Sequence, residues 1–418
     1  MEKTLRPTVL VVATLDTKGV EALYLKECIE REGCNTILMD TGILSEPAVK
    51  SDISREYVAR MGGATIEELK ASGDRGRSIQ TMIRGAAEVA KKLYEESSID
   101  GIIGIGGAQG TNISTSAMRA LPVAFPKVMI STVASGRERF GSYIGTKDIC
   151  IIHSVADIQG LNFLTKKILL NGALAISGMV KGKELRDKIK PAGKTVALSI
   201  SGTTTPGGLK AKEILEERDF EVVCFHQNGT GGVAMEDLIL EGAFEGVLDI
   251  NLHEVGDWVA GGLHAAIRDD RLEAAGKMGI IQVVAPGAIN YTVQPPPLSD
   301  EMKKRKHVVH NPHHILVRLS DSEMERLGRV VAKKLNRAKG PCHFFIPLRG
   351  FSFPDREGLE HWDPEGNRVF IETLKKNLRP DIPCEEIDAH VNDPEFSEIV
   401  AEKFIEYMKS ARKNAKTN

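Results

Sequence analysis

The sequence IIGIGGAQGT, residues 102–111, predicts a buried strand that ends at a glycine-rich turn and leads directly into a helix. Such a turn aims backbone N–H groups and the positive end of a helix at one point, which suits a phosphate. The turn lacks the Lys of a nucleotide P-loop, because Gly110 directly precedes Thr111. It also follows about the third strand, whereas the dinucleotide fingerprint follows the first. Two interpretations stay open: an anion site, and a tight strand-to-helix connection without a ligand.

Strands and helices alternate on both sides of this turn. Continuous apolar runs predict strands buried on both faces, and the longer segments between them predict helices. The expected strands of this half are 9–15, 36–40, 101–105, 127–132 and 148–153, and the expected helices include 20–32, 77–97 and 163–182. This alternation predicts a parallel sheet with helices on both faces.

A charged segment, residues 181–194, is the expected linker to a second series of the same kind. Its expected strands are 195–201, 221–226, 246–252, 280–285 and 342–347, its expected helices are 209–218, 234–241, 322–338 and 394–412, and residues 413–418 are expected to fray. The sequence thus predicts an α/β protein of two domains, residues 1–182 and 193–418. We expect the carboxyl ends of both sets of strands to face a shared cleft.

Composition excludes several classes of protein. A chain of 418 residues is too long for one ordinary core, and its net charge of −2 comes without a long basic block that would favour nucleic acid. The six cysteines are scattered without a CxxC pair, which favours a reducing compartment. The N-terminus lacks the apolar core of a signal peptide, and the longest apolar runs are of strand length. We therefore expect a cytoplasmic protein that binds neither nucleic acid nor a membrane.

Small and charged residues at strand ends of the first half are candidates for binding a phosphate-bearing cofactor. These candidates are Asp16, Lys18, Gly106, Gly107, Gly110, Thr111, Ser135, Gly136 and Arg137. Lys18 follows the first strand and would supply the cation that the turn after the third strand lacks. Arg137, or Arg139 beside it, would contact a phosphate from the end of the fourth strand.

The second half offers candidates for chemistry. A glycine-rich turn before a helix forms another nest of N–H groups, and its residues Gly229, Thr230, Gly231 and Gly232 are expected to bind a substrate anion. His226 would act as general acid or base, and Glu254 and Asp257, one helical turn apart, would hold Mg²⁺ or a proton. The alternative is that His226, Glu254 and Asp257 are ordinary strand-end and helix-start residues.

Four histidines, His307, His310, His313 and His314, crowd one short window. Pro312 lies between the second and the third and breaks the helical spacing that would align them on a metal ion. We therefore expect a polar loop that folds over the cleft, and no metal site in the chain.

Nine motifs occur in a fixed order along the chain: TLDTKG, GIGGAQGT, TVASG, SVADIQGLN, SGTTTPGG, FHQNGTGGVAMEDLI, VAPGAINY, HNPHH and NDPEF. Together they resemble an uncharacterised family typified by the ATP-binding N-terminal half of the tomato mosaic virus resistance protein, over essentially the whole chain. The resemblance implies two Rossmann-like subdomains, ATP as the cofactor, with or without Mg²⁺, and a homo-oligomer, specifically a dimer. It implies no reaction. Two functions stay open: an enzyme that acts on a small anionic metabolite, and a non-catalytic nucleotide-binding regulator that works through oligomer or partner contacts.

Overall fold

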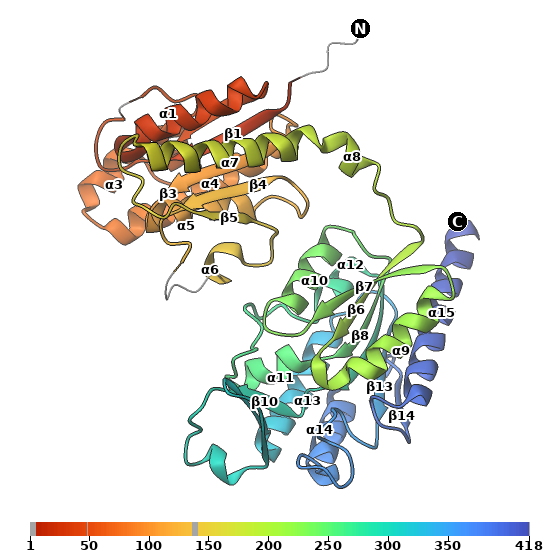
Figure 1. Ribbon diagram of the computed structural model, residues 1–418. Helices are drawn as coiled ribbons and strands as arrows, with labels where there is room; N and C mark the ends of the chain where they lie inside the picture. The colour runs from red at the N-terminus through yellow and green to blue at the C-terminus, as the bar shows by residue number, and fades with distance from the viewer. Residues whose placement is uncertain (1–5, 48, 136–140, 418) are drawn as a thin grey trace. The chain divides into compact units, whose positions relative to one another are not determined.

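The structure is a computed structural model that describes residues 6–47, 49–135 and 141–417. The chain forms two compact units, Met1–Lys190 (unit 1) and Pro191–Asn418 (unit 2), and each is described by itself (Figure 1). The division falls inside the charged segment 181–194. The shared cleft stays a prediction.

Unit 1 is built on a five-stranded sheet in which all neighbours are parallel, in the order β2-β1-β3-β4-β5. The strands are β1 Thr8–Ala13, β2 Asn35–Asp40, β3 Gly101–Gly106, β4 Lys127–Ser131 and β5 Cys150–His153. Helices α1 Leu15–Arg31 and α7 Phe163–Lys181 pack on one face. Helices α2 Arg55–Met61, α3 Ile66–Ser72, α4 Arg75–Glu95 and α5 Ala108–Arg119 cover the other, and α6 Gly141–Ile144 and α8 Lys183–Asp187 are short. Alternate residues of β1 enter the two cores, as expected of a strand buried on both faces.

Unit 2 repeats this plan with six parallel strands in the order β14-β13-β9-β8-β6-β7. They are β6 Lys194–Ile200, β7 Phe220–His226, β8 Gly246–Asn251, β9 Ile281–Gly287, β13 Cys342–Pro347 and β14 Cys384–Ile387. Helices α9 Thr205–Glu216 and α15 Pro394–Thr417 cover one face. Helices α10 Gly231–Leu240, α11 His253–Ala260, α12 Ala274–Met278, α13 Asp321–Leu335 and α14 Pro364–Asn377 cover the other, and η1 Gly202–Thr204 and η2 Met302–Lys304 are 3₁₀ turns.

Both units are therefore Rossmann-like, and both sheets follow the same doubly wound order. In each sheet the first strand of the unit lies between the second and the third, so chain direction across the sheet reverses between the first and the third strand. Open α/β sheets bind ligands at the carboxyl ends of the strands at such a reversal. The fold thus marks one place in each unit: between β1 and β3 in unit 1, and between β6 and β8 in unit 2.

Two expectations about unit 2 were wrong. The histidine-rich window is an antiparallel hairpin, β11 His307–Asn311 and β12 His314–Arg318, which joins β10 Tyr291–Gln294 in a small sheet of its own. Apolar residues of β12 enter small clusters in this region, and that burial turns a polar segment into a strand. The last helix also continues to Thr417, beyond its expected end, because its final turns consist mostly of good helix formers.

Helix α7 is, within the described residues, the helix long and apolar enough by length and composition to cross a membrane. The core helix of a globular unit passes the same test. Gly172 of α7 lies against Ile130 of β4 so closely that a Cβ there would be 2.4 Å from the isoleucine side chain. The helix is accordingly part of the core of unit 1.

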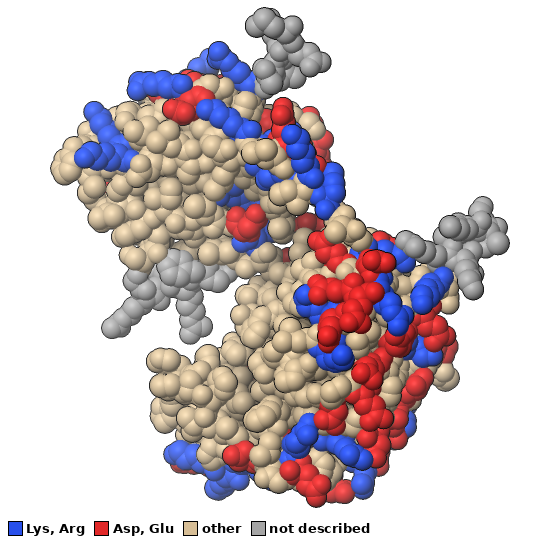
Figure 2. Space-filling model, turned by 45° about the vertical axis from the view of Figure 1, so that its right-hand side comes forward, with Lys and Arg blue, Asp and Glu red and all other residues tan. Residues whose placement is uncertain are grey.

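In Figure 2, charged side chains of both signs are interleaved along the right-hand side of unit 2, whereas much of the rest of the view is uncharged. In unit 2, ion pairs such as Lys212–Glu216 and Arg218–Glu402 link neighbouring positions on and between α9 and α15. This mixing agrees with the small net charge of −2.

Candidate functional site

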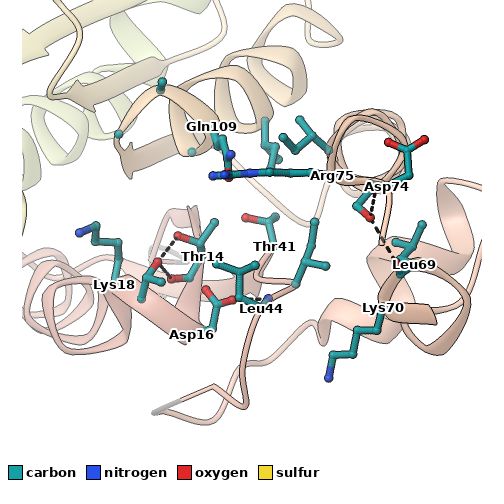
Figure 3. Close-up of a pocket in the computed structure, with 18 of the residues that line it drawn as sticks. Thr14, Asp16, Lys18, Thr41, Leu44, Leu69, Lys70, Asp74, Arg75 and Gln109 are labelled. Atoms are coloured by element: carbon teal, nitrogen blue, oxygen red, sulfur yellow. Dashed lines mark hydrogen bonds between the residues drawn. The ribbon is translucent and has the colours of Figure 1, made fainter. Parts of the chain in front are cut away.

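A cavity of about 720 Å³ opens in unit 1 at the carboxyl ends of β1, β2 and β3, at the strand reversal. Its lining comes from the turn after β1, the loop after β2, the connection between α3 and α4, and the start of α5 (Figure 3). The segments that contribute are 14–18, 41–44, 69–79 and 107–113, together with Gln159. The volume is within the range of small-molecule sites.

The three glycines Gly106, Gly107 and Gly110, at the end of β3 and the start of α5, differ in the space that surrounds each Cα. A Cβ on Gly106 would lie 2.7 Å from the Cα of Gly110, and one on Gly110 would lie 3.2 Å from the Ile105 carbonyl oxygen. These two glycines let α5 approach β3 closely. A Cβ on Gly107 would meet nothing nearer than the Thr132 hydroxyl at 3.6 Å, and Gly107 lines the cavity. Gly107 and Gly110 therefore border the cavity, whereas Gly106 serves helix–strand packing.

The start of α5 is exposed to the cavity as a helix N-terminus. Its N-cap residue, Gly107, has no side chain to bond the first N–H groups, and no side-chain cap is formed. Thr111, in the first turn, is turned away: its buried hydroxyl lies 2.7 Å from the Ser131 hydroxyl and ties α5 to β4. Thr111 thus braces the turn and does not line the cavity.

Asp16 and Lys18 both line the cavity, as their place after β1 predicts. The Asp16 carboxylate accepts a hydrogen bond from the Leu44 N–H at 2.8 Å, which fixes the loop after β2 as one wall. Lys18 interrupts the helical backbone with φ −127° and ψ 21°, and its ammonium donates to the Gln159 side chain at 3.2 Å. Asp16 shapes the wall, and Lys18 supplies a positive charge.

Sequence reasoning missed the contribution of the α3–α4 connection. Arg75, the first residue of α4, lines the cavity opposite Lys18, and its side chain points toward Gln109 of α5 in Figure 3. With the amide oriented to satisfy both groups, the Gln109 oxygen accepts from Arg75 Nε at 2.7 Å. The signal was present in the stretch SGDRGR, residues 72–77, which ends one helix and starts the next.

The candidates after β4 are not brought to this cavity by the described residues. The Ser135 hydroxyl lies 3.2 Å from His153 Nε2, next to β5, and Ser135 is absent from the cavity lining. Gly136, Arg137 and Arg139 lie outside the described residues.

In unit 2 the N–H groups of the glycine-rich nest are bonded to the chain itself. Glu254 Oε1 accepts from the N–H groups of Asn228 at 3.1 Å, Gly229 at 2.8 Å and Gly232 at 3.0 Å. The N–H of Gly231 points at the Asn228 side chain at 3.3 Å, and that of Thr230 points at the same oxygen. These N–H groups are therefore not available to a substrate anion, because a buried carboxylate of the protein already occupies the nest.

Glu254 also belongs to a buried ionic network. Arg271 contacts Asp249 at 2.6 Å, Glu236 at 3.0 Å and Glu254 at 3.6 Å, and all four side chains are buried. Burial raises the pKa of Glu254, and the Arg271 charge and the nest N–H bonds oppose that effect. Glu254 ties α11 to the nest, a structural role rather than that of an acid or base. His226 lies exposed at the end of β7, outside this network.

Asp257 belongs to a different cluster, at the carboxyl end of β8. Its Oδ2 accepts from the His264 N–H at 2.7 Å and lies 3.8 Å from His253 Nε2, while its Oδ1 accepts from the Val293 N–H at 2.9 Å. The His264 ring meets that of His253 edge-on, with centroids 5.4 Å apart. Burial, with His253 nearby, lowers the pKa of His264 to about 4, so that its ring is neutral at pH 7. The sequence analysis named Asp257 but neither histidine.

Comparison with known proteins assigns the family. The N-terminal domain model of the uncharacterised protein family UPF0261 matches residues 7–185, and the C-terminal domain model matches residues 193–408. The UPF0261 protein of Clostridium tetani is 43% identical over 403 residues, 96% of this chain and 98% of that protein. The ToMV resistance protein Tm-1(GCR237) of Solanum lycopersicum is 35% identical over 349 residues, 81% of this chain and 45% of that protein.

Among solved structures, a putative UDP-N-acetylglucosamine 2-epimerase from Listeria monocytogenes covers 67% of this chain and 79% of its own, with 13% identity and a TM-score of 0.24. A likeness at this level carries no argument about function. The family models together span nearly the whole chain, and the relatives match over nearly the same length. The chain belongs to the uncharacterised protein family UPF0261.

Proposed function

We propose that unit 1 binds ATP, with Mg²⁺, in the cavity at the ends of β1, β2 and β3. The observation that carries the proposal is the open N-terminus of α5 at Gly107, which faces a cavity of nucleotide size at the strand reversal. Helix N-termini bind phosphate through their free N–H groups and their positive dipole end.

Positive side chains line the same cavity as this N-terminus. Lys18 approaches from α1 and Arg75 from α4, and both line the cavity. Their charges complement a triphosphate, which a single helix end would neutralise only in part. Lys18 thus takes the place of the lysine that the turn itself lacks.

Part of the lining is apolar and suits a base. Ile43, Leu44, Leu69 and Ile79 come from the loop after β2 and from the ends of α3 and α4. Apolar walls beside a few polar groups are typical of small-molecule sites. The cavity therefore offers apolar side chains to a base as well as charged ones to the phosphates.

The test is calorimetric titration of Mg²⁺–ATP into the intact chain and its Gly107→Val variant. Valine fits the backbone at Gly107, where φ is −78°, but its methyl groups would cover the start of α5. We expect one ATP per wild-type chain and at least about a tenfold weaker binding to the variant.

The control is Gly178→Val on α7, an exposed glycine in open space. It makes the same chemical change in the same unit and should bind ATP like the wild type. Absence of ATP binding to the wild type would overturn the proposal, as would equal affinity in Gly107→Val. Release of ADP during incubation with small anionic metabolites would identify an enzyme, and stoichiometric binding without turnover a regulator.

A further inference from the structure

The strand reversal of unit 2, between β6 and β8, carries a cluster that the ATP proposal does not use. Helix α11 begins at His253, two residues after β8 ends, and Asp257 follows one turn later. The two side chains therefore share one face of α11, and both are buried. His264 comes back to them from the loop after α11, through the bond of its N–H to Asp257.

The His253 ring is held in one tautomer. Its Nδ1 lies 3.1 Å from the Ala288 carbonyl oxygen, which can only accept, so Nδ1 carries the proton and Nε2 carries a lone pair. Nε2 is buried and has no hydrogen-bond partner among the residues that the structure describes, and only 1% of the residue is exposed. A buried polar atom left unpaired is costly and calls for an explanation.

Two further groups that could bind a metal ion lie beside Nε2 of His253, and a shared ion would explain why this nitrogen has no hydrogen-bond partner among the described residues. One ligand atom each from His253, Asp257 and His264 lie within 4.8 Å of one another. Asp257 is oriented by two backbone N–H groups, and His253 by a backbone carbonyl, which are the outer contacts that metal ligands usually have.

We propose that His253, Asp257 and His264 bind a divalent transition-metal ion, with Zn²⁺ as the first candidate. Two imidazoles and one carboxylate suit Zn²⁺ or Fe²⁺ better than Mg²⁺ or Ca²⁺, which prefer oxygen ligands. Three protein ligands leave a position open for water or substrate, the arrangement of reactive rather than purely structural zinc sites. This proposal departs from the expectation, drawn from the sequence, that the chain holds no metal.

The test uses the untagged intact chain, stripped with a chelator and titrated with Zn²⁺ alone. We expect one tightly bound Zn²⁺ per wild-type chain. His264→Ala should bind at least about tenfold more weakly, because one of three ligands is lost. His264 is only partly buried, so this variant keeps the core intact, and its thermal unfolding is measured alongside.

His310→Ala and His313→Ala are the matched controls, since both histidines are exposed on the β11–β12 hairpin. They should bind Zn²⁺ like the wild type. Co²⁺ provides a readout on the wild type itself: its visible absorption bands should show low-symmetry ligation by nitrogen and oxygen. The proposal is overturned if the wild type binds neither metal, if His264→Ala binds like the wild type, or if the hairpin variants lose the metal.

Discussion

Among single residues, two neighbouring glycines at the end of β3 have different roles: one allows close packing and the other borders the cavity. Gly106 lacks a side chain because the backbone of α5 occupies that space, whereas Gly107 lacks one beside open cavity. Gly106 ends an apolar strand and Gly107 directly precedes a helix, and the sequence pattern does not distinguish their roles. Only the distance from each missing Cβ to its neighbours separates packing from binding.

This difference predicts different effects of the same substitution. Gly106→Ala places a Cβ 2.7 Å from the Gly110 Cα, a backbone atom that cannot move alone, and should lower the free energy of unfolding by about 1–3 kcal/mol. Gly107→Ala, whose nearest contact is 3.6 Å away, should change stability by less than about 0.5 kcal/mol. Denaturant unfolding of the two variants checks this, and equal losses would contradict the packing role of Gly106.

The occupant of the nest at residues 228–232 could not be predicted from the sequence. Its geometry and glycines are those of an anion site, and an anion does bind there: the carboxylate of Glu254. The two partners are more than twenty residues apart, and β8 stands between them in the chain. Local pattern identifies free N–H groups, but it does not show which distant side chain will reach them.

At the scale of elements, prediction depended on apolar content. Strand β13, Cys342–Pro347, was predicted to the residue, because six consecutive buried positions make an unmistakable apolar run. Strands β10, β11 and β12 were missed, because each mixes polar with apolar residues and β11 is largely exposed. Likewise the α3–α4 connection was overlooked as a wall of the cavity, although the stretch SGDRGR marks the end of one helix and the start of the next.

The loop that precedes α14 is joined to β12 by His361, and this contact predicts a pH dependence. The His361 ring is fully buried, with Nε2 3.2 Å from the Leu316 carbonyl oxygen. Burial, with the Arg318 charge adding to it, lowers the pKa of His361 from 6.5 to about 4. Between these two pH values the unfolded chain binds a proton here that the folded chain does not.

The contribution of His361 is therefore complete above pH 6.5 and is lost as the pH falls toward 4, by up to about 3 kcal/mol. His361→Gln keeps a donor for the Leu316 carbonyl and removes the titration. Its free energy of unfolding should vary less steeply over this range than that of the wild type, measured by denaturant unfolding at several pH values. His310→Gln, an exposed control, should keep the wild-type slope. Parallel slopes for all three chains would contradict the assignment.

At the scale of the whole molecule, the chain carries two doubly wound units of the same strand order, and each has functional candidates at its own reversal. In unit 1 these are a helix N-terminus, a lysine and an arginine around a cavity. In unit 2 they are two histidines and an aspartate. The fold and the strand ends that border the cavity of unit 1 could be predicted from the sequence, because apolar runs place strand ends. The cluster of unit 2 could not, because it depends on contacts between residues far apart in the chain.

Hydrogen–deuterium exchange of the intact chain, with and without Mg²⁺–ATP, tests the proposed binding of nucleotide in unit 1. We expect slower exchange in peptides that cover residues 14–18, 69–79 and 107–113, where backbone and side chains line the cavity. Peptides across residues 228–232 should be unchanged, because Glu254 already holds their N–H groups. Unchanged exchange at residues 107–113, or protection confined to residues 228–232, would contradict it.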